Sequence, residues 1–130
     1  MKVETILGDF AASLERLSEA LEQGAADDIR RAGCIQYFEF TFELAWKSIQ
    51  AVAAYHGLEP VRSPRAAFKT AFLQTWIDDQ EPWLAMLSAR NRMSHVYSAR
   101  DAMNVFEELP SFLNPLRKLL ERLNSEAGSG

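Results

Sequence analysis

Cysteine is nearly absent from this sequence, and so is any long apolar run. The one cysteine, Cys34, has no partner for an intrachain disulfide and cannot build a zinc site alone. No apolar stretch approaches the roughly 20 residues that cross a bilayer, and no basic-then-apolar leader opens the chain. These absences predict a soluble protein of a reducing compartment, which we expect to be the cytoplasm, without a membrane partner.

Glycine-rich loops and metal-ligand spacings are missing too. Phosphate loops and dinucleotide fingerprints need a strand, a glycine turn and a helix, and neither the glycines nor strand-like alternation occur. A helical di-metal site needs Glu-x-x-His pairs, but His56 follows Ala53 at that spacing and His95 follows Arg92. We therefore expect no metal and no cofactor.

Three polar or reactive side chains have simple structural explanations. Glu39 and Glu43 share a helix face, where solvation or an ion pair with Lys47 accounts for them. Cys34 lies beside apolar positions of the same helix, which favours a buried and inert thiol.

Apolar residues recur at steps of three and four along most of the 130 residues, as in amphipathic helices. The first stripe runs from Ile6 to Leu21. A second helix is predicted from about Asp28, capped by Asp27 or Asp28, to His56, with Gly57 as its C-terminal cap.

Ser63 and Pro64 predict the start of a third helix, and Asp78 and Asp79 cap a fourth. In the last stretch Pro110 and Pro115 predict a short helix, a bend and a longer helix. The pattern indicates an all-α, antiparallel up-and-down four-helix bundle with a short extra helix. It forms one domain over residues 1–124, followed by a disordered tail at 125–130.

Aromatic residues are in excess on the second helix. Most fall on the core stripe, but Tyr37 and Phe40 fall off it. A helix that is apolar all round is either central or part of an interface, so these two residues predict contact with a second subunit.

Basic charge is concentrated in one region of an acidic chain. The net charge is −4, yet residues 62–100 contain six basic and three acidic residues, a balance of +3, which leaves −7 elsewhere. Within it, Asn91 and His95 share a helix face, whereas Arg90 and His95 lie roughly 140° apart on an ideal helix. Arg90 and His95 reach one phosphate if the helix end loosens or a second copy supplies one of them. Alternatively, His95 caps the helix C-terminus and Tyr97 is core.

Three stretches together resemble the nucleotidyltransferase substrate-binding protein family, a HepT-like branch of the HEPN superfamily. They are the run FEFTFELAWK at 38–47, Ser63-Pro64-Arg65, and the run from Trp83 through RNxxSHxY at 90–97. The resemblance implies a helical bundle that forms homodimers and is encoded beside a minimal nucleotidyltransferase. It also implies a toxin–antitoxin pair and metal-independent ribonuclease activity.

Carried onto this chain, the resemblance assigns roles residue by residue. The catalytic pair is Arg90 and His95, and Tyr97 is the tyrosine that the partner transferase adenylylates. Asn91 and Ser94 lie alongside them in support. Separately from the resemblance, we expect Arg65 and Arg92, two arginines of the basic region, to bind phosphate. The chain departs from the family pattern at Arg92 and Met93, which adds a charge and leaves the motif intact.

Two other functions remain open. In one, the protein is a non-catalytic subunit that binds nucleotide or docks the partner transferase. In the other, it is a helical interaction domain in which the motif is structural. The candidate partners are a second copy, a nucleotidyltransferase and RNA.

Overall fold

Helices make up most of the chain in the computed structural model, which describes residues 2–95 and 98–128. They are α1 (Val3–Glu22), α2 (Asp28–Tyr55), α3 (Pro64–Leu73), α4 (Glu81–Arg92), a 3₁₀ turn (Met93–His95) and α5 (Ala99–Gly128). No strand occurs in the described ranges, and no helix in them is both long and apolar enough to span a membrane.

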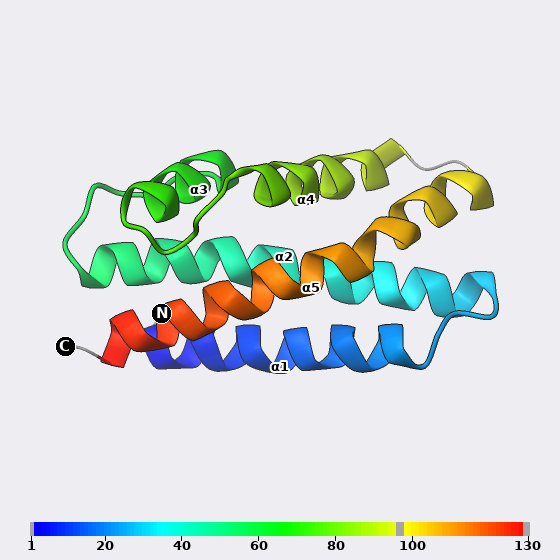
Figure 1. The fold of residues 1–130 in the computed structure, drawn as a ribbon, viewed down its shortest axis with the longest axis horizontal. Coiled ribbons are helices and arrows are strands. Elements are labelled where there is room, and N and C mark those ends of the chain that lie inside the picture. The colour runs from blue at the N-terminus through cyan, green and yellow to red at the C-terminus, as the bar shows by residue number, and fades with distance from the viewer. Residues whose placement is uncertain (1, 96–97, 129–130) are drawn as a thin grey trace.

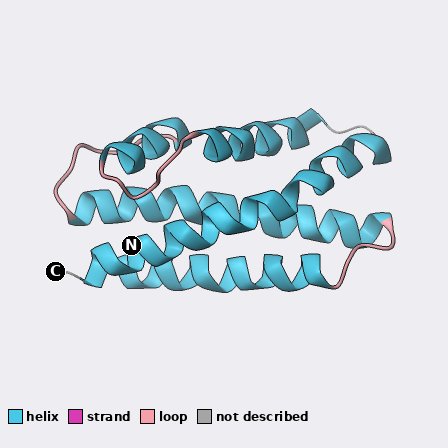
Figure 2. Ribbon diagram, in the orientation of Figure 1, coloured by secondary structure: helices cyan, strands magenta, loops and turns pink. Residues whose placement is uncertain are grey.

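The helices alternate in direction along the long axis of the molecule (Figure 1). α1 and α2 run antiparallel, and α3 and α4 follow one another along the side of α2 opposite α1. α5 then returns to pack on α1 and α2. Short loops join them (Figure 2). The predicted all-α up-and-down bundle is confirmed, with α3 and α4 together occupying one of its four positions.

Local capping groups set the predicted starts of α2 and α3, whereas the N-cap position of α4 is held by Gln80, not by Asp78 or Asp79 as expected, and its side chain makes no capping hydrogen bond. The side chain of Asp27 accepts a hydrogen bond from the backbone N–H of Arg30 at 2.8 Å and so begins α2. Ser63 caps α3 in the same way, and Pro64 occupies the first turn. Gly57 follows α2 with a φ of +73°, a conformation that glycine adopts without steric cost.

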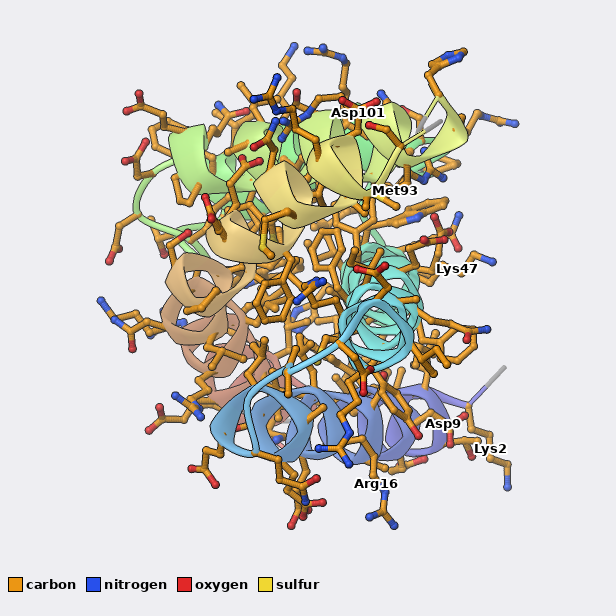
Figure 3. All side chains as sticks on the ribbon, turned by 90° about the vertical axis from the view of Figure 1, so that its right-hand side faces the viewer. Lys2, Asp9, Arg16, Lys47, Met93 and Asp101 are labelled. Atoms are coloured by element: carbon orange, nitrogen blue, oxygen red, sulfur yellow. The ribbon has the colours of Figure 1, made fainter. Side chains whose placement is uncertain are left out.

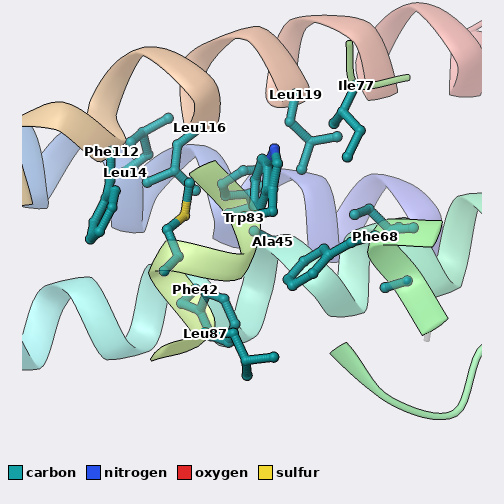
Figure 4. Close-up of a cluster of buried hydrophobic side chains, with 14 of the residues drawn as sticks. Leu14, Phe42, Ala45, Phe68, Ile77, Trp83, Leu87, Phe112, Leu116 and Leu119 are labelled. Atoms are coloured by element: carbon teal, nitrogen blue, oxygen red, sulfur yellow. The ribbon is translucent and has the colours of Figure 1, made fainter. Parts of the chain in front are cut away.

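Aromatic side chains join the helices in the core (Figure 4). The rings of Phe38 on α2 and Phe112 on α5 stack with centroids 5.4 Å apart. Phe68 of α3 contacts Phe42 at 5.9 Å and Trp83 of α4 at 5.3 Å. Burying each such ring contributes about 1.5–3 kcal/mol, so this chain of contacts holds α3, α4 and α5 onto α2.

Cys34 belongs to this core. It is buried, and burial raises the pKa of its thiol, because the thiolate is poorly solvated there. The interpretation of an inert structural thiol therefore agrees with its surroundings.

The C-terminal region differs from its prediction in two ways. α5 is one continuous helix that contains Pro110 and Pro115, where a bend between two helices was predicted. Each proline removes one backbone donor, but the apolar face of α5 is buried along its length, and that packing outweighs the lost hydrogen bonds.

The predicted disordered tail is also wrong for residues 125–128, which belong to α5. Glu126 explains the difference, since its backbone carbonyl lies 3.2 Å from Nε2 of His56 and its carboxylate pairs with Arg122. The contact with His56 holds the last turn against the C-terminal end of α2, and the pair with Arg122 supports the turn from within α5. Residues 129 and 130 lie outside the described residues.

Candidate functional site

The side chains of α4 change from buried and apolar to exposed and polar towards its C-terminal end. Trp83, Met86 and Leu87 are buried against the bundle. The residues of the predicted motif follow on the last turn and the 3₁₀ turn, where Asn91 and His95 are exposed. Basic residues are favoured at a helix C-terminus because the partial charge of the terminal carbonyl groups is negative.

An open hollow lies between this segment and α3. Its apolar lining includes Leu84 and Leu87, and its polar groups come from both helices. The lining residues are Arg65, Leu84, Leu87, Ser88, Asn91, Arg92 and His95. The structure therefore brings together four predicted site residues, two of them guanidinium groups that suit phosphate oxygens.

A second hollow adjoins the first at the start of α5. It is lined by Arg92, His95, Asp101, Asn104 and Val105. Figure 3 looks onto this end of the bundle, with Met93 and Asp101 at the top and Arg16 of α1 at the bottom. Arg92 pairs with Glu108 of α5, while His95 makes no side-chain hydrogen bond to another described residue. His95 is thus accessible from both hollows.

Arg90 points elsewhere. Its Nη2 donates to Oε1 of Glu43 on α2 at 2.6 Å, and its guanidinium lies 5.7 Å from the ring centroid of Phe42. Its Nη1 donates to Oδ1 of Asn91 at 3.2 Å. Within one chain, Arg90 therefore does not line either hollow beside His95, as the helix geometry of their five-residue spacing predicts.

Two further predicted residues are not placed in the hollows. Ser94 is exposed on the 3₁₀ turn but does not line either one. Tyr97, the predicted modification site, lies outside the described residues.

The acidic pair on α2 has a different role from the one predicted. Glu43 pairs with Arg90 and accepts a hydrogen bond from Nε1 of Trp46 at 3.0 Å, so its partners are these two side chains, where solvation or an ion pair with Lys47 was expected. Burial raises the pKa of Glu39, Arg90 partly offsets this, and the negative charge of Glu43 adds to it. No spacing in the sequence signals the contact of Glu43 with a residue 47 positions away.

Metal-binding side chains do not gather in the described ranges. No group of three or more histidine, cysteine, aspartate or glutamate residues is placed there to hold an ion.

Residues 6–125 match the family described as nucleotidyltransferase substrate binding protein like. The chain belongs to this family. The match includes all three stretches that carried the resemblance, so the family predicted from the sequence is confirmed.

Known relatives agree with this membership. The chain is 29% identical over 107 residues to "Probable ribonuclease HepT" of Haemophilus influenzae, an alignment that covers 79% of this chain and 73% of that protein. A crystal structure from Thermus thermophilus superposes with a TM-score of 0.80 at 29% identity, covering 88% of this chain and 98% of the other.

A second solved structure, from Haemophilus influenzae, superposes with a TM-score of 0.81 at 26% identity. It covers 91% of this chain and 98% of its own, and is described as revealing the fold of a substrate binding domain of a nucleotidyltransferase. The fold of that structure therefore extends over nearly the whole of the present chain.

Proposed function

We propose that this protein is a metal-independent endoribonuclease of the HepT type, with His95 as its proton-transfer group. The observation that carries the proposal is the convergence of Arg65, Asn91, Arg92 and His95 on one open hollow. Such a site offers permanent positive charge for phosphate oxygens beside an imidazole, the side chain that most often serves as a general acid or base. The likeness to a relative named as a ribonuclease supports the same function.

The reaction needs only the RNA and these side chains. His95 accepts the proton of a ribose 2′-hydroxyl, and the 2′-oxygen attacks the adjacent phosphorus. The bond from phosphorus to the 5′-oxygen breaks, and that oxygen takes up a proton. The products are a 2′,3′-cyclic phosphate and a 5′-hydroxyl end. Arginine side chains stabilise the charge that develops on the phosphate oxygens.

A two-fold dimer forms part of the proposal, because Arg90 and His95 of one chain face different ways. An isologous dimer brings Arg90 of one copy to His95 of the other. Tyr37 and Phe40 support such an interface: they are exposed, their rings meet edge to face at 6.2 Å, and Phe40 lies one turn from Glu43 on α2. Sedimentation equilibrium is expected to give a dimer for the wild type and a monomer for Phe40→Glu.

Adenylylation of Tyr97 by a partner nucleotidyltransferase is the proposed regulation. The added nucleotide places bulk and negative charge beside His95 and so excludes RNA. Incubation with a purified minimal nucleotidyltransferase and ATP is expected to add one AMP to the wild type and none to Tyr97→Phe, measured by intact-mass spectrometry.

The deciding test is cleavage of a fluorescent single-stranded RNA of mixed sequence in EDTA. The wild type is expected to cleave it, and His95→Ala is expected to lose about 100-fold or more, the range typical of general acid–base groups. Normal cleavage by a folded His95→Ala dimer contradicts the proposal.

A second candidate function is a non-catalytic subunit that presents a nucleotide to the partner transferase. The observation that favours it is the bond from Arg90 to Glu43, which leaves the hollow with binding groups but without the second catalytic residue. Titration with AMP, ATP and inorganic phosphate tests it. Micromolar binding that is lost in Arg65→Ala, together with no RNA cleavage by the wild type, identifies this function.

A further inference from the structure

The bond between Arg90 and Glu43 joins α4 to α2 across the surface of the bundle. Nη2 of Arg90 and Oε1 of Glu43 are 2.6 Å apart, which is short for a charge-assisted hydrogen bond. Both side chains are about a third exposed, so the pair is partly shielded from water and lies at the surface. Its surface position leaves Arg90 within reach of a bound molecule.

Glu43 is itself held in place. Its second carboxylate oxygen, Oε2, accepts a hydrogen bond from Nε1 of Trp46 at 3.0 Å. Trp46 is half-buried and packs against the core, so the carboxylate has one oxygen on a fixed indole and the other on the guanidinium. A carboxylate fixed at both oxygens cannot rotate freely, and it therefore fixes the direction of Arg90.

Arg90 keeps donors for a further ligand. A guanidinium has five N–H groups, of which one is given to Glu43 and one to Oδ1 of Asn91. The ring of Phe42 lies against one side of the group. Ordering a free arginine side chain costs about 2 kcal/mol of conformational entropy. Arg90 is already ordered in the folded chain, so binding of RNA does not carry this cost.

We propose that Glu43 is a positioning residue for Arg90: it orients the guanidinium whose remaining N–H groups bind the scissile phosphate. This inference rests on the proposed ribonuclease function. Glu43 touches no substrate, and its effect passes through Arg90. Because a small displacement of a catalytic group costs on the order of 10²-fold in rate, losing this contact lowers turnover more than binding.

The competing role for Glu43 makes the opposite prediction. A carboxylate that masks Arg90 lowers the affinity for RNA and the rate together, so removing its charge raises both. A carboxylate that positions Arg90 gives a lower rate when its charge is removed, while the loss of a negative group near phosphates leaves binding unchanged or slightly tighter.

Glu43→Gln tests the proposal, with Glu19→Gln as the matched control. Glu19 forms an exposed pair with Arg16 on α1, so the control removes the same charge and also breaks an arginine–glutamate pair, far from α4. Cleavage of the mixed-sequence RNA gives kcat and KM. Affinity for the same RNA carrying 2′-O-methyl groups, which block cleavage, gives binding alone. Circular dichroism reports folding and Tm for both variants.

We expect kcat to fall about 10- to 100-fold in Glu43→Gln, with KM and the affinity for the methylated RNA within about threefold of wild type. Glu43→Asp keeps the charge but is one methylene shorter, so it is expected to recover part of the lost kcat. Glu19→Gln is expected to match the wild type in all three quantities.

An unchanged or raised kcat in folded Glu43→Gln overturns the positioning role while leaving the ribonuclease function intact. A rise in KM as large as the fall in kcat also overturns it, since that result indicates a binding role. Absence of cleavage by the wild type overturns the ribonuclease function itself, and the positioning role with it.

Discussion

The two histidines occupy opposite ends of the bundle and have contrasting surroundings. His56 ends α2, where its Nε2 lies 3.2 Å from the carbonyl oxygen of Glu126 and its ring is 5.9 Å from that of Trp76. His95 ends the 3₁₀ turn after α4, exposed, beside Arg65 and Arg92. One imidazole joins two helix ends, and the other is left available beside positive charge.

This contrast shows that residue type alone does not identify a functional histidine. A ring packed on aromatic and backbone groups contributes to stability, because those contacts exist only in the folded chain. An exposed ring beside two guanidinium groups contributes little to folding but can act on an anionic ligand. Substitutions at four positions test this contrast between the two ends of the bundle.

The largest effect is expected at Arg90. Under the proposed ribonuclease function, Arg90→Ala is expected to remove a donor to the developing charge and to lower kcat for RNA cleavage by about 100- to 1,000-fold, with a small loss of stability. Arg90→Lys keeps the charge but lacks the planar fork, so it is expected to restore only a minor part of the rate. Single-turnover cleavage measures both. A rate within tenfold of wild type for Arg90→Ala excludes Arg90 from the catalytic chemistry.

A smaller effect is expected at Arg65, on the α3 side of the hollow. Arg65→Ala is expected to weaken binding of the methylated RNA several-fold and to reduce the slope of log affinity against log salt by about one. Arg30→Ala is the matched control, because Arg30 is an exposed arginine on the first turn of α2, with Asp27 as its partner. Equal slopes for the two variants contradict phosphate binding in the hollow.

At the other end, His56→Ala is expected to leave cleavage unchanged and to lower the free energy of unfolding by about 1 kcal/mol. The loss comes from the contact with Glu126 and the packing on Trp76. Urea denaturation measures it, and His95→Ala provides the reciprocal comparison, with stability close to wild type. If His56→Ala is as stable as the wild type but does not cleave RNA, then His56, and not His95, is the functional histidine.

The smallest effect is expected at Glu39. Because burial raises the pKa of this carboxyl, the folded state binds its proton more tightly than the unfolded state does. Stability from this group is therefore lost as pH rises from the ordinary carboxyl pKa through the raised one. Glu39→Gln is expected to be slightly more stable than wild type at neutral pH and to lose that advantage in acid. Thermal unfolding at several pH values measures it, and a constant difference contradicts the assignment.

Much of the fold follows from local sequence signals. The caps at Asp27 and Ser63 and the turn at Gly57 lie where the sequence predicts them, since each acts within a few residues of itself. Part of the site follows for the same reason: Asn91, on the last turn of α4, and His95, four residues later in the 3₁₀ turn, line one hollow.

The two wrong predictions concern the C-terminal region, where contacts between residues far apart in the sequence determine the structure. Pro110 and Pro115 predict a break, but the buried face of α5 keeps the helix continuous, because packing along its whole length exceeds two missing hydrogen bonds. The C-terminal tail differs from its prediction for a similar reason. Its small and polar residues predict disorder, but the contact of Glu126 with His56, 70 residues earlier, orders it.

The helices, the family and the residues of the motif can be predicted from the sequence, because periodicity, capping and spacing act between near neighbours. How the arginines are used depends on the packing of the helices. Arg65 joins the hollow only because α3 packs beside α4, and Arg90 turns to α2 only because Glu43 lies there, 47 residues away. Contacts of that separation depend on how helices pack, and no local pattern records them.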